Sequence, residues 1–341
     1  MEKQKVLKPL QLVHHRKLIL IMVMVLLLVL TGCKGSSKTI TDKDVRKGFD
    51  GLATEFVKNA PPDKVFEETL FPIAIKLNNK GASNIKNGFL ALGFETAYVD
   101  FANELSGPRH FEIEGKSIFD LNGDEKFITL NGETKKIGVQ SETHPSTILA
   151  TACYQYQSIL GTSVCVDTDI FGTGLREKSC QVKELTFSQG QGGPVAITKI
   201  ETRMLPLQDE VIETEDGIRQ EPNKVRPHFI VHVENKGNGE VINLKKIEAA
   251  CTKSTLDFDD FNRLTIKAFL SNEQELNCNI GDKTGDAEVR LREKKDVIRC
   301  TLEEGINRVQ DAYTTPLRIE MDYGYTFTIS KDITIEKILT Y

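Results

Sequence analysis

Apolar and polar residues alternate along most of the chain after residue 50. Phe71, Ile73, Ile75 and Leu77 are each separated by one residue, and the stretch 229–233 repeats this alternation. Because successive side chains of a strand point to opposite faces, the pattern predicts half-buried β-strands. Further strand-like runs are found at 51–58, 88–97, 109–113, 125–130, 147–156, 264–269, 287–291, 297–302 and 317–325.

Turn signals are frequent between these runs. Asn122-Gly123 and Asn131-Gly132 lie on either side of the run at 125–130 and predict tight hairpin turns. Short strands separated by frequent turns favour antiparallel β-sandwiches.

Helix signals are few. Thr41 followed by Asp44 predicts a short helix with a capped start. The spacing of Leu302, Ile306 and Val309 predicts a second short helix, before the run at 317–325.

Two landmarks occur twice, in the same order. Asn-Lys-Gly ends a strand-like run at 79–81 and again at 235–237, 156 residues later. Tyr-x-Tyr follows at 154–156 and again at 323–325, 169 residues later, so the second copy has about 13 extra residues between its landmarks. The repeat predicts a duplicated β-domain. We expect Asn and Gly in the turns because both tolerate positive φ.

The predicted fold is therefore mainly β, with two Ig-like antiparallel β-sandwich domains in tandem after an N-terminal signal or anchor segment. The predicted segments are a signal with a lipobox at 1–32, a linker at 33–48, a first sandwich at 49–187, a Gly-rich linker at 188–194 and a second sandwich at 195–341.

The N-terminal segment predicts export. Basic residues precede thirteen apolar residues at 18–30, a run too short to span a bilayer comfortably, since about 20 are needed. Leu30-Thr31-Gly32-Cys33 resembles the lipobox of prokaryotic lipoproteins, which implies that Cys33 carries a diacylglyceryl group. An uncleaved signal anchor is the alternative. Both predict membrane attachment, with residues 34–341 on the extracytoplasmic face.

The six other cysteines predict disulfides, because an exported chain meets an oxidising environment and no C-x-x-C motif is present. Six cysteines allow 15 pairings. Proximity in sequence favours Cys165 with Cys180 and Cys278 with Cys300, which leaves Cys153 and Cys251 to bridge the two halves. Each local bridge would stabilise the fold by about 3 kcal/mol.

The composition indicates a folded protein and makes some classes of binding partner less plausible. The chain has 341 residues, of which 39% are hydrophobic and 27% charged, as in a folded globular protein. Without residues 1–32, 39 basic and 48 acidic residues remain, which argues against nucleic acid as a partner. Trp is absent, so neither a Trp-pinned Ig core nor a Trp sugar platform is expected.

A strand ending in Asn-x-Gly after a Pro turn resembles the CARDB and NEW3 type of Ig-like domain of archaeal and bacterial surface proteins. The carriers are the run at 51–58, Asn59-Ala60-Pro61-Pro62 and the run at 71–81. The segments NAPPDKVFEETLFPIAIKLNNKGA, TACYQYQ with CVDTD, and GQGGPVAITKIE are similar to uncharacterised archaeal exported lipoprotein-like proteins over most of 50–341. This resemblance implies a β-sandwich fold but no established activity.

Sequence motifs for catalysis are absent, so we expect no enzyme and no cofactor; an envelope hydrolase with an unrecognised site is a minor alternative. Asp167 and Asp169 are weak candidates for Ca²⁺ ligands. His228 and His232 share one strand face but lie about 13 Å apart, too far for one metal ion. We expect a structural or protein-interaction module of the cell envelope, with other envelope proteins as partners. The alternative is a surface lipoprotein that binds Ca²⁺ or glycan.

Overall fold

The computed structural model describes residues 22, 40–101, 107–172, 177–207, 224–252, 255–279, 287–308 and 312–338. The described residues from Thr41 onward belong to one compact unit. The predicted signal segment, apart from Met22, lies outside the described residues, and so does Cys33.

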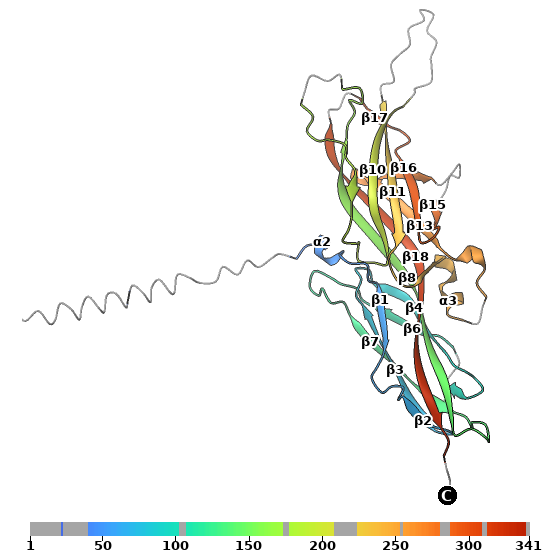
Figure 1. Cartoon of the computed structure of the whole chain (residues 1–341). Coiled ribbons are helices and arrows are strands. Elements are labelled where there is room, and N and C mark those ends of the chain that lie inside the picture. Colours follow the sequence, from blue (N-terminus) through green and yellow to red (C-terminus); the bar gives the residue numbers. More distant parts are fainter. Residues whose placement is uncertain are drawn as a thin grey trace, which may run out of the picture. The chain divides into compact units, whose positions relative to one another are not determined.

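Two long antiparallel strands organise this unit (Figure 1). Strand β8 (Thr143–Val166) and strand β18 (Tyr313–Glu336) have 24 residues each and pair over their whole length. Strands in globular proteins are usually 3–10 residues long, so this two-stranded ribbon is unusual.

The other strands complete two sheets. The smaller sheet has the order β1 (Leu52–Phe56), β3 (Leu70–Asn79), β7 (Glu125–Thr134), β5 (Val99–Phe101). The larger sheet follows the order β6 (Arg109–Ile113), β4 (Ile85–Gly93), β8, β18, β13 (Arg263–Leu270), β14 (Gln274–Asn279), β16 (Lys295–Thr301), β11 (Lys224–Asn235), β10 (Val195–Leu207), β9 (Leu185–Thr186). Four short strands join at its sides: β2 (Lys64–Phe66), β12 (Glu240–Ile242), β15 (Ala287–Arg290), β17 (Ile306–Asn307). The helical segments are α2 (Asp42–Val45), η1 (Leu244–Lys246), α3 (Ile247–Ala250), η2 (Phe258–Asp260), η3 (Ser271–Glu273).

Strands from both halves of the sequence pair with the ribbon formed by β8 and β18. Strand β4, from the first half, pairs with residues 149–154 of β8, and β13, from the second half, pairs with residues 317–323 of β18. The C-terminal end of β18 returns to the first half, where residues 334–336 pair in parallel with β2. The predicted mainly β, antiparallel class is confirmed. Two separate tandem Ig-like domains are not confirmed, because β8 and β18 run through both halves.

Alternation correctly predicts which side chains form the core. Ile73, Ile75 and Leu77 of β3 are fully buried, and the inward side chains of both halves join one continuous hydrophobic cluster. In β11, Phe229 and Val231 are buried as well, while the neighbouring histidines lie on the other face and are partly exposed.

Three local predictions are wrong. Asn122-Gly123 forms no hairpin, because the strands on either side of it, β6 and β7, pair with other strands and not with each other. Asn131-Gly132 forms no turn but continues β7, where Gly132 lies opposite Phe71. Glycine is needed there because a Cβ would lie 2.5 Å from Cζ of the Phe71 ring. The helix expected from the spacing of Leu302 and Ile306 is absent from the described residues, since Ile306 begins β17; Val309 lies outside the described residues.

The predicted N-terminal helix is confirmed as α2. Thr41 donates from both its backbone N–H and its hydroxyl to the carboxylate of Asp44, at 3.2 and 2.8 Å. This capping box begins the helix where the sequence predicts it.

Candidate functional site at the tyrosine junction

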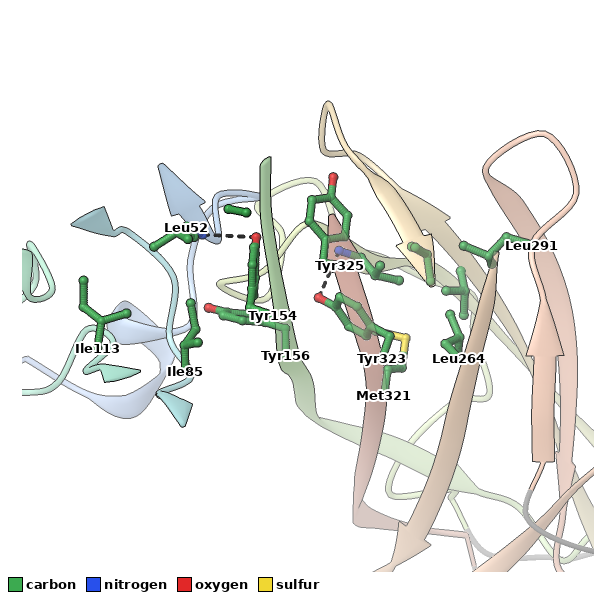
Figure 2. Packing of buried hydrophobic residues seen from close by; sticks show 14 of the residues in the cluster. Leu52, Ile85, Ile113, Tyr154, Tyr156, Leu264, Leu291, Met321, Tyr323 and Tyr325 are labelled. Carbon is green, nitrogen blue, oxygen red and sulfur yellow. Dashed lines mark hydrogen bonds between the residues drawn. The ribbon is translucent and has the colours of Figure 1, made fainter. Parts of the chain in front are cut away.

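Four tyrosines meet where the two halves join, and we call them the tyrosine junction. Tyr154 and Tyr156 of β8 lie opposite Tyr325 and Tyr323 of β18 (Figure 2). Residues two apart on a strand share a face, so both pairs point into the core. Neighbouring ring centroids are 5.8 to 6.3 Å apart, which is within the range of favourable aromatic pairs.

The first tyrosine of each pair binds the first residue of a strand, β1 in one case and β10 in the other. The hydroxyl oxygen of Tyr154 accepts a bond from the Leu52 backbone N–H at 3.3 Å. That of Tyr323 accepts one from the Val195 backbone N–H at 3.3 Å and lies 2.8 Å from the Ser158 hydroxyl. The two tyrosines thus hold equivalent positions of β1 and β10.

The second tyrosine of each pair binds the loop after the Asn-Lys-Gly turn. The Tyr156 hydroxyl accepts from the Ser83 backbone N–H at 3.2 Å and donates to the carbonyl of Gly192 at 2.9 Å. The Tyr325 hydroxyl accepts from the Gly239 backbone N–H at 2.8 Å. Ser83 and Gly239 are 156 residues apart, the offset of the sequence repeat.

The two Asn-Lys-Gly turns have the same hydrogen bonds. The side-chain oxygen of Asn79 accepts from the Gly81 N–H at 3.2 Å, and its amide nitrogen donates to the Ser83 carbonyl at 2.8 Å. Asn235 makes both bonds at the same offsets, at 3.1 and 3.0 Å. The predicted turns and their duplication are therefore confirmed at the level of individual bonds.

The reason for glycine in these turns differs from the one expected. Neither Gly81 nor Gly237 has a positive φ. A Cβ on Gly81 would lie 1.8 Å from the Tyr156 hydroxyl oxygen, and one on Gly237 would lie 2.2 Å from that of Tyr325. Glycine is required because the tyrosine hydroxyl occupies the place of a side chain, so the two repeated landmarks contact each other.

The predicted Gly-rich linker at 188–194 is bound to this junction. Gly190 and Gly192 do have positive φ, and Gly192 donates to the carbonyl of Gly48 at 2.9 Å while accepting from the Ala82 N–H at 2.7 Å. The side-chain amide of Gln191 is buried and bonds to the backbone of Ile197 in both directions. The segment is a fixed turn between the halves.

Because the tyrosines of the junction are buried, we expect the protein to lose stability at alkaline pH. Burial raises the pKa of Tyr154 and Tyr323 well above the ordinary value of 10 and that of Tyr325 to about 12. In the unfolded chain the tyrosine hydroxyls lose their protons near pH 10. The stabilisation that comes from keeping them protonated in the fold is therefore complete below pH 10 and is lost as pH rises toward the pKa values of the folded protein. The free energy of unfolding should fall by about 1.4 kcal/mol per pH unit for each tyrosine.

Urea unfolding at pH values on both sides of 10 measures this slope. The Tyr323→Phe variant is the control, because removing one buried phenol should reduce the slope by about 1.4 kcal/mol per pH unit. Unfolding free energies that stay constant above the ordinary tyrosine pKa would contradict the prediction.

A groove with a volume of about 630 Å³ opens beside the junction, and we call it the junction groove. It is lined by residues 49–54 at β1, by 236–240 at the second Asn-Lys-Gly turn, by 325–329 of β18, and by Tyr154 and Pro194. Strand β1 pairs only with β3 in the smaller sheet, so among the described residues its other edge is open. The groove therefore lies between the edges of two sheets.

The β18 side of the junction groove contains a gap in strand pairing. On the edge away from β8, residues 317–323 pair with β13, residues 324–326 with β12 and residues 334–336 with β2. Between them, residues 327–333 pair with no described strand on that edge. Native proteins usually cover or blunt such an edge.

The repeat places a second groove, of about 470 Å³, along the equivalent part of β8. It is lined by residues 159–162 and 186–191 and also by Asp42, Lys43, Arg46 and Lys47. The chain's own segment around α2 thus forms part of its wall. No described segment occupies the corresponding place in the junction groove.

The six predicted disulfide cysteines form three bridges. Cys165 pairs with Cys180, and Cys278 with Cys300, as proximity favours; Cys153 pairs with Cys251. The last bridge joins β8 to Cys251 at the C-terminal end of α3, and Ile247 of α3 packs with both cysteines and Ile242 in a small second core.

The weak metal candidates are neutralised by a lysine. Lys178 Nζ lies 2.6 Å from an Asp167 carboxylate oxygen and 2.9 Å from the Asp169 carbonyl. The Asp167 carboxylate also accepts from the Asp169 N–H at 3.0 Å. An ammonium group therefore occupies the position where a cation would bind. Within the described residues, no group of three or more His, Cys, Asp or Glu side chains could hold a metal ion.

Comparison with known proteins is uninformative about function. No family model and no curated protein matches the chain. A crystal structure of a serine-rich repeat adhesion glycoprotein from Streptococcus agalactiae is similar over 89% of this chain and 100% of its own, at 9% identity and a TM-score of 0.16. That TM-score is too low to indicate a shared fold. In the described ranges, no helix is long and apolar enough to cross a membrane.

Sequence reasoning missed the junction groove. It depends on which strands lie next to residues 327–333, and periodicity does not reveal strand neighbours. The available signal was the pair of repeated landmarks, whose contact across the junction brings β1, the second Asn-Lys-Gly turn and β18 together.

Proposed function

We propose that the protein is a membrane-anchored, extracytoplasmic lipoprotein that serves as a protein-interaction module of the cell envelope. The junction groove carries the interaction part of the proposal, because it combines an open strand edge with a partly apolar wall. Three disulfides fit an exported protein. The export signal and lipobox in the sequence support attachment through Cys33.

Attachment is tested by the intact mass of the detergent-extracted protein. We expect the mass of residues 33–341 plus a diacylglyceryl group, with six thiols that react only after reduction. The Cys33→Ser variant should lose the lipid mass while the three disulfides remain. A full-length mass in the wild type would contradict lipidation and favour a signal anchor.

Interaction is tested separately, by crosslinking intact cells and recovering the protein from the envelope. We expect specific envelope proteins to be recovered with the wild type. Recovery of none, from cells in which the protein is lipidated and exposed to external protease, would contradict the role as an interaction module.

A further inference from the structure

The backbone at the gap in β18 is oriented to receive another strand. The Thr334 N–H donates to the Asp63 carbonyl at 2.8 Å, and the Glu336 carbonyl accepts from the Glu67 N–H at 2.9 Å. Backbone groups of alternate residues in a strand point to the same edge. Thr328 and Ser330 therefore direct their N–H and C=O groups toward the open edge, Thr328 within the lining of the junction groove and Ser330 directly beyond it.

The side chains around this edge favour an extended, partly apolar occupant. Phe327 and Ile329 point inward and are half-buried, and Phe327 packs against the Tyr154 ring. The inward side chain of Lys331 forms an ion pair with Asp63, which bounds the apolar stretch at the β2 end. An occupant therefore meets apolar surface on its inward face and solvent on its outward face.

The same edge already receives strands from within the chain. Strand β2 pairs with it in parallel over three residues, and β12 pairs with it antiparallel over three residues. A guest strand between them would continue the sheet without displacing either. Strand addition is an established mode of peptide recognition, in which main-chain bonds provide affinity and alternate side chains provide specificity.

We propose that the junction groove binds an extended segment of a partner protein, with alternating apolar side chains, which adds as a strand to β18 at Thr328 and Ser330. This deepens the proposed function and rests on it. The second groove is not expected to bind such a segment, because the chain around α2 forms part of its wall.

The test uses the full chain in detergent and a phage-displayed library of random twelve-residue peptides as the probe. Ser330→Pro removes the outward N–H and leaves the bonds to β8 in place, since proline is tolerated at open strand edges. Ser330→Ala is the matched control, because the Ser330 side chain is exposed. Gly161→Pro places the same change at the equivalent position of the second groove, 169 residues earlier.

We expect enriched peptides with alternating apolar residues that bind the wild type, Ser330→Ala and Gly161→Pro equally and bind Ser330→Pro at least about tenfold more weakly. Failure to enrich any peptide, or equal binding to Ser330→Pro, would overturn strand addition.

Hydrogen exchange on the wild type gives an independent measurement if Ser330→Pro does not fold. The amides of Thr328 and Ser330 should become protected when an enriched peptide is added, and unchanged exchange would also overturn the proposal. Lipidation and the recovery of envelope partners are measured in separate experiments. If the protein is lipidated and recovers partners but binds no peptide, strand addition is rejected while the proposed function stands.

Discussion

Replacement of Gly81 by alanine is expected to lower the free energy of unfolding by about 3–5 kcal/mol. The new methyl carbon would lie 1.8 Å from the Tyr156 hydroxyl oxygen and within 2.8 Å of two carbonyl oxygens, of Gly192 and Asp50. Overpacking a core by a methyl group costs about 1–3 kcal/mol, and displacing the buried hydroxyl from its partners costs about 1–3 kcal/mol more. Urea or guanidinium unfolding measures the loss.

Gly161→Ala is the matched control, because a Cβ there would meet nothing within 4 Å. It should leave stability unchanged or raise it by up to about 1 kcal/mol, since alanine restricts the unfolded chain more than glycine does. The repeat predicts the same effect at the second turn. Gly237→Ala should also destabilise the protein, because the new Cβ would lie 2.2 Å from the Tyr325 hydroxyl oxygen. A loss below about 1 kcal/mol in both junction variants would contradict the packing described.

Removal of the Cys153–Cys251 bridge is the second large expected effect. The bridge joins residues 98 positions apart, and the chain-entropy relation gives about 4.7 kcal/mol for a loop of this size. The double variant Cys153→Ala, Cys251→Ala should lose about 4 kcal/mol by chemical denaturation. It should also speed hydrogen exchange in α3, because α3 contributes to a small core around the two sulfurs.

The double variant Cys165→Ala, Cys180→Ala is the comparison, since its shorter loop of separation 15 is expected to contribute about 3 kcal/mol. Two outcomes would contradict the role given to the longer bridge at α3. One is an equal loss of unfolding free energy in the two variants, and the other is faster hydrogen exchange in α3 when only Cys165 and Cys180 are replaced.

The strands that bury one face in the core were largely predicted, whereas β10 and β14 were not among the predicted runs. The alternation of Ile73, Ile75 and Leu77 follows directly from burial of one face, and the start of α2 follows from the chemistry of Thr41 and Asp44. The extent of β8 and β18 was underestimated, because the predicted runs covered only 147–156 and 317–325. Burial alternates along their outer ends as well, but polar residues such as Ser146, Ser158 and Thr315 occupy buried positions there, so the apolar pattern in the sequence is weak.

The candidate site was only partly predictable. The repeat correctly located both turns and both Tyr-x-Tyr pairs, but it could not show that Gly81 faces Tyr156, because that contact depends on strand register. Asn131-Gly132 misled for the same reason: a glycine that accommodates the Phe71 ring inside a strand has the same local sequence as a hairpin turn.

The pairing of β18 with β8 also determines when the chain can fold. Thr143 pairs with Glu336, the last residue of β18, and Val166 pairs with Tyr313. The smaller sheet involves neither strand, but the larger sheet cannot be completed until β18 has been synthesised. Contacts this distant in sequence form slowly, because the long intervening loop must first be closed. Until β18 has been synthesised, strand β8 therefore has an unpaired edge along its whole length, of the kind that can pair with other chains.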